Sequence, residues 1–221
     1  FQKKFVIPIE KDEKKEKVQQ LQSLIRPFLL RRTKKDEEVA LNLPDKLEQK
    51  EYCPLTAEQA SLYEQLIHDT FAEIEKLSGF ERKGLILQML SRLKQLCNHP
   101  ALYLKEKSAG RELLERSNKL EKLVELIDAV LEQGESCLIF TQYIEMGEMI
   151  RSTLKKKFGI EVPFLNGSVP KAKRDEMIEQ FQNQEFPVFL LSLKAGGTGL
   201  NLTAANHVIH YDRWWNPAVE N

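Results

Sequence analysis

The chain has 221 residues, of which 42% are hydrophobic and 30% are charged, and this composition supports one good core with a smaller satellite. Basic and acidic residues number 33 each, so the net charge is zero and bulk electrostatics does not indicate a nucleic-acid binder. No apolar run approaches the ~20 residues that would cross a bilayer, and the start of the chain is too charged for a secretory signal. We therefore expect a soluble intracellular protein with no membrane partner.

The three cysteines, Cys53, Cys97 and Cys137, lie far apart in the sequence. This spacing favours reduced core thiols over a disulfide framework. Cys97 and His99 form the only close Cys/His pair, and nothing in the sequence supplies the other ligands of a zinc site. We expect no metal site in this chain.

Residues 1–50 open with a strand-like apolar stretch at 5–9, followed by a charge-dense helix. In that helix Val18, Leu21, Leu24 and Ile25 recur at helical spacing, and Pro27 interrupts it. The acidic run at 36–38 and a proline at position 44 predict a turn or a flexible connection.

Residues 54–116 have the pattern of paired helices. Thr56 can cap a first helix, Gly79 is expected to stop it, and a second helix runs from about Arg82 to Cys97 before Pro100 ends it. Each helix carries an apolar stripe, which favours two helices packing on each other over any cofactor box. The charged segment 105–116 predicts a mobile loop.

From Asn118 the pattern changes to alternating helix and strand, which favours a parallel sheet covered by helices. Asn118 and Glu121 resemble a capping box, and Gly134 closes the first helix. The elements that follow are a strand at 137–141, a helix at 145–158, a strand at 162–165, a helix at 170–183, and strands at 188–192 and 207–211. Right-handed crossovers would place the loops 141–143, 166–169 and 192–201 on one sheet edge, where such sheets bind ligands.

A glycine-rich loop lies in the stretch SLKAGGTGLNLTAANHVIHYDRWWNP, residues 192–217. Exposed N–H groups in such a loop can face a phosphate, but glycines alone are weak evidence. A dinucleotide-binding enzyme is one alternative. It fits poorly, because GGTG departs from GxGxxG and Asp212 follows Gly199 too closely to be the expected acid.

As a whole string, this stretch resembles the fifth motif of the Swi/Snf-type helicase-like ATPases, the DNA-translocating motors of the second helicase superfamily. LIFTQY at 138–143 resembles the fourth motif, and LNGSVPKAKR at 165–174 resembles the segment after it. IRPFLLRRT at 25–33 and LPDK at 43–46 resemble the block that joins the two lobes of the motor, and CNHP at 97–100 is a further family landmark. The matches occur in family order along nearly the whole chain.

The resemblance implies an α/β fold, a RecA-like (P-loop NTPase-type) three-layer lobe with a parallel sheet, a helical protrusion and an N-terminal linker segment. Residues 1–50 would be the end of the first lobe and the interlobe linker, 51–116 the protrusion inserted in the second lobe, and 117–221 the second lobe. The family's GxxxxGK[ST] loop and acidic magnesium-binding motif belong to the first lobe and do not occur here. The sixth motif is expected just beyond Asn221, so we expect half a motor with no complete catalytic set.

By the resemblance, the DNA-backbone contacts are Thr141, Gln142, Ser168, Arg174, Ser192, Lys194 and Trp215. The residues near the nucleotide are Gly197, Gly199 and Asn201. Hydroxyl, amide and cationic groups bind phosphate oxygens without reading bases, as a motor on any sequence requires. Alternatives remain: a helix cap for Ser168, a tight turn without ligand for the glycines, and core packing for Trp215.

The span from Arg151 to Arg174 holds seven basic residues against one acid, Glu161, a local excess of the kind that phosphate contacts need. The alternative is that Lys155 to Lys157 form the solvated end of a helix. The four histidines share their motifs with no nucleophile or paired carboxylate, so we expect them to be structural.

The resemblance implies ATP and Mg²⁺ as the ligands of the complete protein, held mainly by the absent first lobe and not by this chain alone. The expected partners are double-stranded DNA and the missing N-terminal RecA-like lobe, for a monomeric, DNA-associated protein of the bacterial cytoplasm or nucleoid or of the eukaryotic nucleus. A different hypothesis is a non-enzymatic helical interaction module, in which residues 54–100 dock a partner protein.

Overall fold

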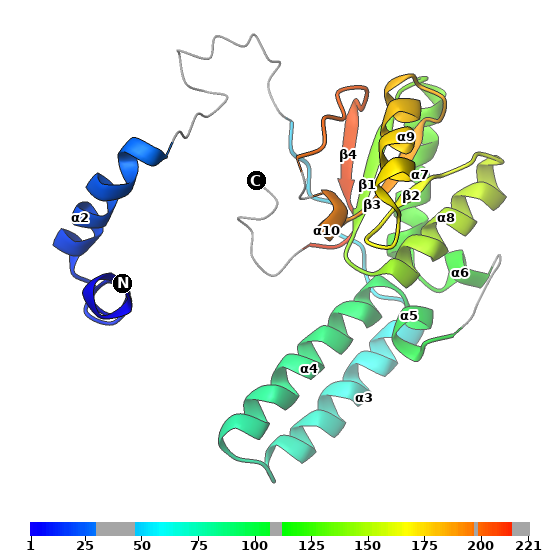
Figure 1. Ribbon diagram of the computed structural model, residues 1–221. Helices are drawn as coiled ribbons and strands as arrows, with labels where there is room; N and C mark the ends of the chain where they lie inside the picture. The colour runs from blue at the N-terminus through cyan, green and yellow to red at the C-terminus, as the bar shows by residue number, and fades with distance from the viewer. Residues whose placement is uncertain (30–46, 107–111, 197–198, 214–221) are drawn as a thin grey trace. The chain divides into compact units, whose positions relative to one another are not determined.

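The computed structural model describes residues 1–29, 47–106, 112–196 and 199–213 (Figure 1). The chain divides into two compact units, Phe1–Lys50 and Glu51–Asn221. Their relative placement is not determined.

The first unit is helical from its start. It contains a π-helical turn, η1 (Gln2–Val6), then α1 (Ile7–Glu10), α2 (Lys15–Ile25) and a 3-10 turn, η2 (Arg26–Phe28). The strand predicted at 5–9 is therefore wrong. Pro8 occupies the first turn of α1, a position that a helix tolerates, whereas a lone strand would leave its backbone groups without partners. The helix predicted from Val18 to Ile25 is confirmed.

The second unit begins with the predicted pair of helices, α3 (Ala57–Ile74) and α4 (Gly79–Asn98). Thr56 caps α3 as expected, in a capping box: its hydroxyl oxygen accepts the Gln59 N–H at 3.2 Å, and the Gln59 side chain accepts the Thr56 N–H at 3.1 Å. Gly79 has a φ of +57°, and it is the first residue of α4. Beyond His99 a short helix, α5 (Pro100–Leu104), starts at the proline that was expected to end α4.

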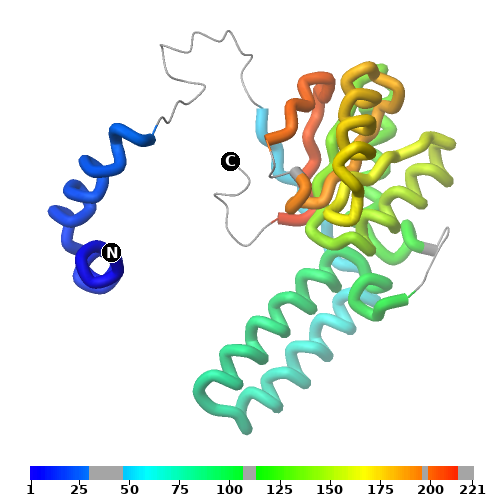
Figure 2. The backbone as a smooth tube through the Cα atoms, viewed as in Figure 1, coloured from blue at the N-terminus to red at the C-terminus, as the bar shows by residue number. Residues whose placement is uncertain are grey.

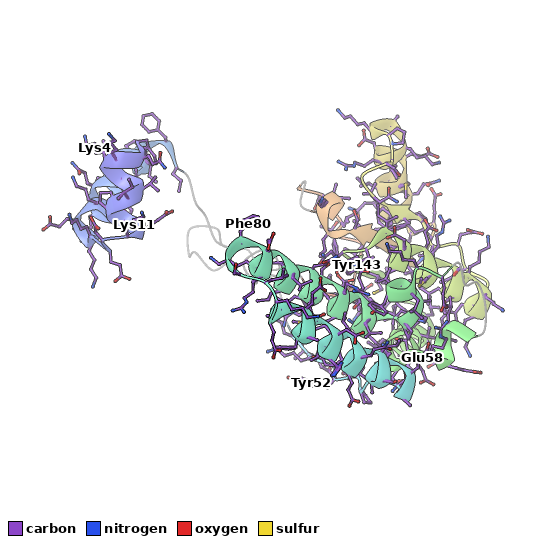
Figure 3. All side chains as sticks on the ribbon, turned by 90° about the horizontal axis from the view of Figure 1, so that it is seen from below. Lys4, Lys11, Tyr52, Glu58, Phe80 and Tyr143 are labelled. Carbon is purple, nitrogen blue, oxygen red and sulfur yellow. The ribbon has the colours of Figure 1, made fainter. Side chains whose placement is uncertain are left out.

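The two long helices pack on each other side by side (Figure 1). Leu66 and Leu96 are buried, and Leu62 and Leu93 are half-buried. Part of each predicted apolar stripe is therefore shielded from solvent, whereas Phe71 and Leu90 of the same stripes are exposed. Figure 3 shows Phe80 and Glu58 at opposite ends of the pair, and Phe80 is 89% exposed.

The mobile loop predicted at 105–116 is wrong for its last part, because α6 (Glu112–Glu115) lies there, and residues 107–111 of the predicted loop lie outside the described residues. Arg116 follows it and donates to both Glu58 on α3 and Glu106, at 2.6 Å each. Ser117 then caps α7 (Asn118–Glu132) by accepting the Leu120 N–H at 3.3 Å. The predicted cap, Asn118, is one residue too late, because the Asn118 side chain instead donates to the Pro54 carbonyl.

The remaining elements alternate as predicted, except that the strand expected at 162–165 is only two residues long and that a short helix occupies the start of the expected glycine-rich loop. They are β1 (Cys137–Thr141), α8 (Ile144–Phe158), β2 (Phe164–Leu165), α9 (Lys171–Gln182), β3 (Val188–Ser192), α10 (Leu193–Gly196) and β4 (His207–His210). The strands form one sheet in the order β2-β3-β1-β4, and every pairing is parallel. The expected α/β fold with a parallel sheet is confirmed.

Helices cover both faces of this sheet (Figure 2). Successive strand residues point to opposite faces, so Ile139 and Leu190 pack with α7 and α8, whereas Leu138 and Leu191 pack with α9. This arrangement gives the three layers that the resemblance predicted. Gly147 on α8 lies so close to the buried Phe164 ring that an added Cβ would be 2.4 Å from its Cζ atom.

Candidate nucleic-acid interface

The carboxyl ends of three neighbouring strands lie at one edge of the sheet. Thr141 on β1 and Ser192 on β3 are register partners. Leu165 on β2 pairs with Leu191 on β3, so the loop 166–169 leaves the sheet beside Ser192. The predicted gathering of Thr141, Ser168 and Ser192 along a shared edge is therefore observed, and we refer to loops 141–143, 166–169 and 192–201 as the rim.

The first rim loop is held by an acid from the end of β4. The Thr141 side chain is fully buried, and its hydroxyl donates to Oδ2 of Asp212 at 2.7 Å. The Gln142 backbone N–H donates to Oδ1 of the same carboxylate at 2.8 Å. The Gln142 side-chain oxygen accepts a hydrogen bond from Lys94 Nζ at 2.8 Å. Thr141 therefore shapes the loop from inside, and Gln142 lies nearer the surface.

The second rim loop is ordered by Asn166. Its side-chain oxygen accepts the Ser168 N–H at 2.9 Å and the Ser168 hydroxyl at 2.6 Å. The helix that follows has Pro170 at its N-cap and no side-chain cap, so Ser168 is not the helix cap that the sequence left open. Arg174, half-buried, lies in the first turn of that helix.

The third rim loop begins with a helical turn where the sequence predicted only a glycine-rich loop. Ser192 is buried, and its hydroxyl oxygen accepts the Ala195 N–H at 3.3 Å within α10. Lys194 on that turn is exposed. Gly199 has a φ of +66°, a conformation that favours glycine, and Asn201 is exposed. Gly197 and Trp215 lie outside the described residues.

The positive segment between Arg151 and Arg174 is partly neutralised by neighbouring acids. Arg151 pairs with Glu148 at 2.9 Å, Lys173 pairs with Glu176 at 3.2 Å, and Lys155 pairs with Glu161. These are exposed pairs of small energetic value, but they reduce the local positive charge that the sequence pattern indicated.

Asp212 is the residue that sequence reasoning missed. In the sequence, Asp212 stands out only as a poorly placed acid for a dinucleotide-binding site, yet it is 2% exposed and organises the first rim loop. Burial lowers the pKa of the neighbouring Lys119, and the Asp212 charge opposes that shift. The Lys119 ammonium group lies 4.7 Å from the centre of the Tyr211 ring. The sequence gives only a weak signal for this role, namely that Asp212 directly follows the strand predicted at 207–211.

His99 has a structural role. Its Nδ1 accepts the Ala101 N–H at 3.0 Å, and its Nε2 bonds the Leu113 carbonyl at 2.8 Å, so the ring is neutral with the proton on Nε2. Burial lowers the pKa of this ring. Within the described ranges, no group of three or more His, Cys, Asp or Glu side chains could hold a metal ion. Across the same ranges, no helix is long and apolar enough to span a membrane.

Two domain families match the chain. The SNF2-related domain matches residues 1–102, and the Helicase conserved C-terminal domain matches residues 118–221. The C-terminal domain of the SWI2/SNF2 ATPase of Sulfolobus solfataricus is 46% identical, with a TM-score of 0.72 over 79% of this chain and 75% of that one. The core of that ATPase, solved in complex with double-stranded DNA, is 43% identical with a TM-score of 0.72 over 98% of this chain and 45% of that one.

The parallel α/β fold, with the motif residues of the rim at its strand ends, is that of a helicase-type C-terminal lobe. The chain belongs to the SWI2/SNF2 ATPase family. A Bacillus subtilis protein, YwqA, whose name describes an ATP-dependent helicase/translocase, is 67% identical over 100% of this chain, which covers 24% of that protein. The chain spans about a quarter of the length of this relative, and about a fifth of the length of a 37% identical Mycoplasma pneumoniae protein whose name describes an ATP-dependent helicase.

Proposed function

We propose that this chain supplies the second motor lobe of an ATP-dependent translocase that moves along double-stranded DNA. Family membership and the gathering of the motif loops at one edge of the parallel sheet support this function. The shared rim is the observation that carries the proposal, because a translocating lobe needs one continuous surface to follow a phosphate backbone.

In this proposal the rim contacts the DNA backbone through Gln142, Ser168 and Lys194, and Arg174 and Trp215 are further contacts that the resemblance implies. Amide, hydroxyl and ammonium groups can bind phosphate oxygens of any sequence. The Sulfolobus core bound to double-stranded DNA supports a DNA partner.

Two of the predicted DNA-backbone contacts, Thr141 and Ser192, are given a structural role in this proposal. Thr141 and Ser192 are buried and bonded within the protein. We assign them to shaping the rim and not to touching phosphate.

The proposal gives this chain half of an ATP site. Gly197, Gly199 and Asn201 would face the nucleotide, whereas the first lobe would hold the phosphates and Mg²⁺. In such motors the two lobes close to position the reacting groups, so the chain alone is expected to bind DNA weakly and to hydrolyse no ATP.

The test compares ATP turnover by the complete protein, with and without duplex DNA, with turnover by this chain alone. We expect DNA-stimulated turnover only in the complete protein. Magnesium-dependent turnover by the pure chain, or no effect of DNA on the complete protein, would contradict the proposal.

A variant pair tests the rim itself. Lys194→Ala should weaken DNA binding and reduce the slope of log affinity against log salt by about one, because one phosphate contact is lost. Lys156→Ala is the matched control: this exposed lysine lies at the end of α8 that leads to the start of β2, at the opposite edge of the sheet. Equal salt slopes in the two variants would remove Lys194 from the DNA surface.

A further inference from the structure

One buried carboxylate joins three elements that are distant in the sequence. Asp212, after β4, accepts the Thr141 hydroxyl and the Gln142 N–H from the end of β1. It also accepts the side-chain amide of Asn98 at 3.1 Å, and Asn98 is the last residue of α4. The carboxylate therefore connects the base of the helical pair to the first rim loop.

Both oxygens of Asn98 accept further hydrogen bonds. Its side-chain oxygen accepts Lys119 Nζ at 2.7 Å. Its backbone oxygen accepts the hydroxyls of Ser117 and Tyr211, each at 3.0 Å. Buried hydrogen bonds that share members in this way favour one arrangement, and they hold the end of α4 against the sheet.

A second connection runs along the same helix. Lys94, one turn before Asn98, donates to the Gln142 side-chain oxygen at 2.8 Å and to the Arg213 backbone oxygen. Gln142 is thus bound from α4 at its side chain directly and at its backbone through Asp212. Two separate sets of hydrogen bonds therefore join α4 to the first rim loop.

We propose that Asp212 is a positioning residue that couples the helical pair α3–α4 to the first rim loop. A tilt of the helical pair would then change the position of Gln142. This inference rests on the proposed function, in which the rim contacts DNA. α4 has 20 residues and is therefore about 30 Å long, so a small tilt at its far end rotates its base. The network transmits that rotation to the loop.

The Asp212→Asn variant tests this coupling because the chemistry makes it selective. The new amide oxygen can still accept the Gln142 N–H, and the Thr141 hydroxyl can turn to accept the new NH₂ group. The Asn98 NH₂ group, however, would meet another donor. Asn98 cannot simply flip, because its oxygen is bound to Lys119. The substitution therefore breaks the link to α4 and spares the links within the lobe.

The compensating variant exchanges the two side chains. In the double variant Asn98→Asp and Asp212→Asn, the new amide donates to the new carboxylate, which also accepts Lys119. The link is restored and the charge of the network is unchanged. Asp128→Asn, at an exposed position on α7, is the matched control for the same chemical change.

The measurement is ATP turnover by the complete protein at saturating duplex DNA and without DNA. We expect Asp212→Asn to lower DNA-stimulated turnover by a factor between about two and thirty, the usual range for loss of coupling between sites. Turnover without DNA should stay within about twofold, the double variant should recover most of the loss, and Asp128→Asn should match the wild type. A merely structural role would lower both turnovers together and would overturn the proposal, as would wild-type DNA stimulation in Asp212→Asn.

Amide hydrogen exchange separates this inference from the proposed function. In the wild type the Gln142 N–H should be protected, and Asp212→Ala, which removes its acceptor, should speed its exchange by about tenfold. An unprotected Gln142 amide in the wild type would overturn the coupling whatever the ATP assay shows. If DNA fails to stimulate the wild type, the proposed function falls, and the exchange result decides the coupling by itself.

Discussion

Replacing Gly147 by alanine should destabilise the α/β lobe, although alanine is normally the better helix residue. The added Cβ would lie 2.4 Å from Cζ and 2.5 Å from Cε1 of Phe164. Carbon atoms in contact normally lie about 3.5–4.0 Å apart, so the overlap exceeds about 1 Å. Phe164 is 5% exposed and packed within the core, and the ring has little room to move.

The size of the effect follows from two opposing contributions. Overpacking a core by one methyl group costs about 1–3 kcal/mol, whereas a glycine-to-alanine change inside a helix gains about 1 kcal/mol. Gly84 on α4 is the matched control, because nothing lies within 4 Å of the Cβ that would be added there. Gly84→Ala should therefore stabilise the chain by up to about 1 kcal/mol.

The assay is urea denaturation followed by far-ultraviolet circular dichroism, with the two variants compared directly. Both gain the same helix propensity, so their difference isolates the overlap, and we expect Gly147→Ala to be less stable than Gly84→Ala by about 1–3 kcal/mol. In a Phe164→Leu background the cost of adding Gly147→Ala should shrink, because the smaller side chain leaves room for the added methyl group. Equal stability of the two alanine variants would refute the reasoning.

Three further predictions concern buried groups. Because burial lowers the pKa of His99, the unfolded state binds more protons below about pH 6.5, so the free energy of unfolding should fall as pH drops below that value. His99→Gln should reduce that pH dependence and the exposed-site control His68→Gln should not, as read from urea midpoints across pH. Burial raises the pKa of the Cys137 thiol to about 12, so alkylating reagents should modify it only after unfolding, in contrast to the half-buried Cys53; equal rates in the native state would contradict its burial. Arg116→Met should lower stability by about 1–3 kcal/mol, because two charge-assisted pairs are lost; an unchanged urea midpoint would show that solvent screens them fully.

Most of the lobe could be predicted because its signals are local. The strand 137–141 and the helices around it follow from apolar runs and periodicity, and the common edge follows from parallel connections. The helix start at Asn118 was off by one because Ser117 and Asn118 are both good cap residues, and only the tertiary fold decides between them. The stretch 5–9 failed because a short apolar run fits a strand or a helix equally well.

The interior of the site could not be predicted in the same way. Asp212 meets Thr141 and Asn98 across separations of 71 and 114 residues, and no local pattern marks such contacts. The resemblance gave Thr141 and Ser192 as DNA-backbone contacts at strand ends, but both side chains are buried, and burial depends on tertiary packing that no local pattern shows. The assignments of Gly197 and Trp215 stay predictions, since they lie outside the described residues.

Hydrogen exchange of the complete protein, with and without duplex DNA, tests the central claim most directly. Our account predicts that DNA slows exchange in the rim loops 141–143, 166–169 and 192–201. It predicts no change at the opposite edge, in the turns at 134–136 and 184–187 that precede β1 and β3. Protection at that opposite edge, or none at the rim, would contradict the assignment of the strand ends as the DNA surface.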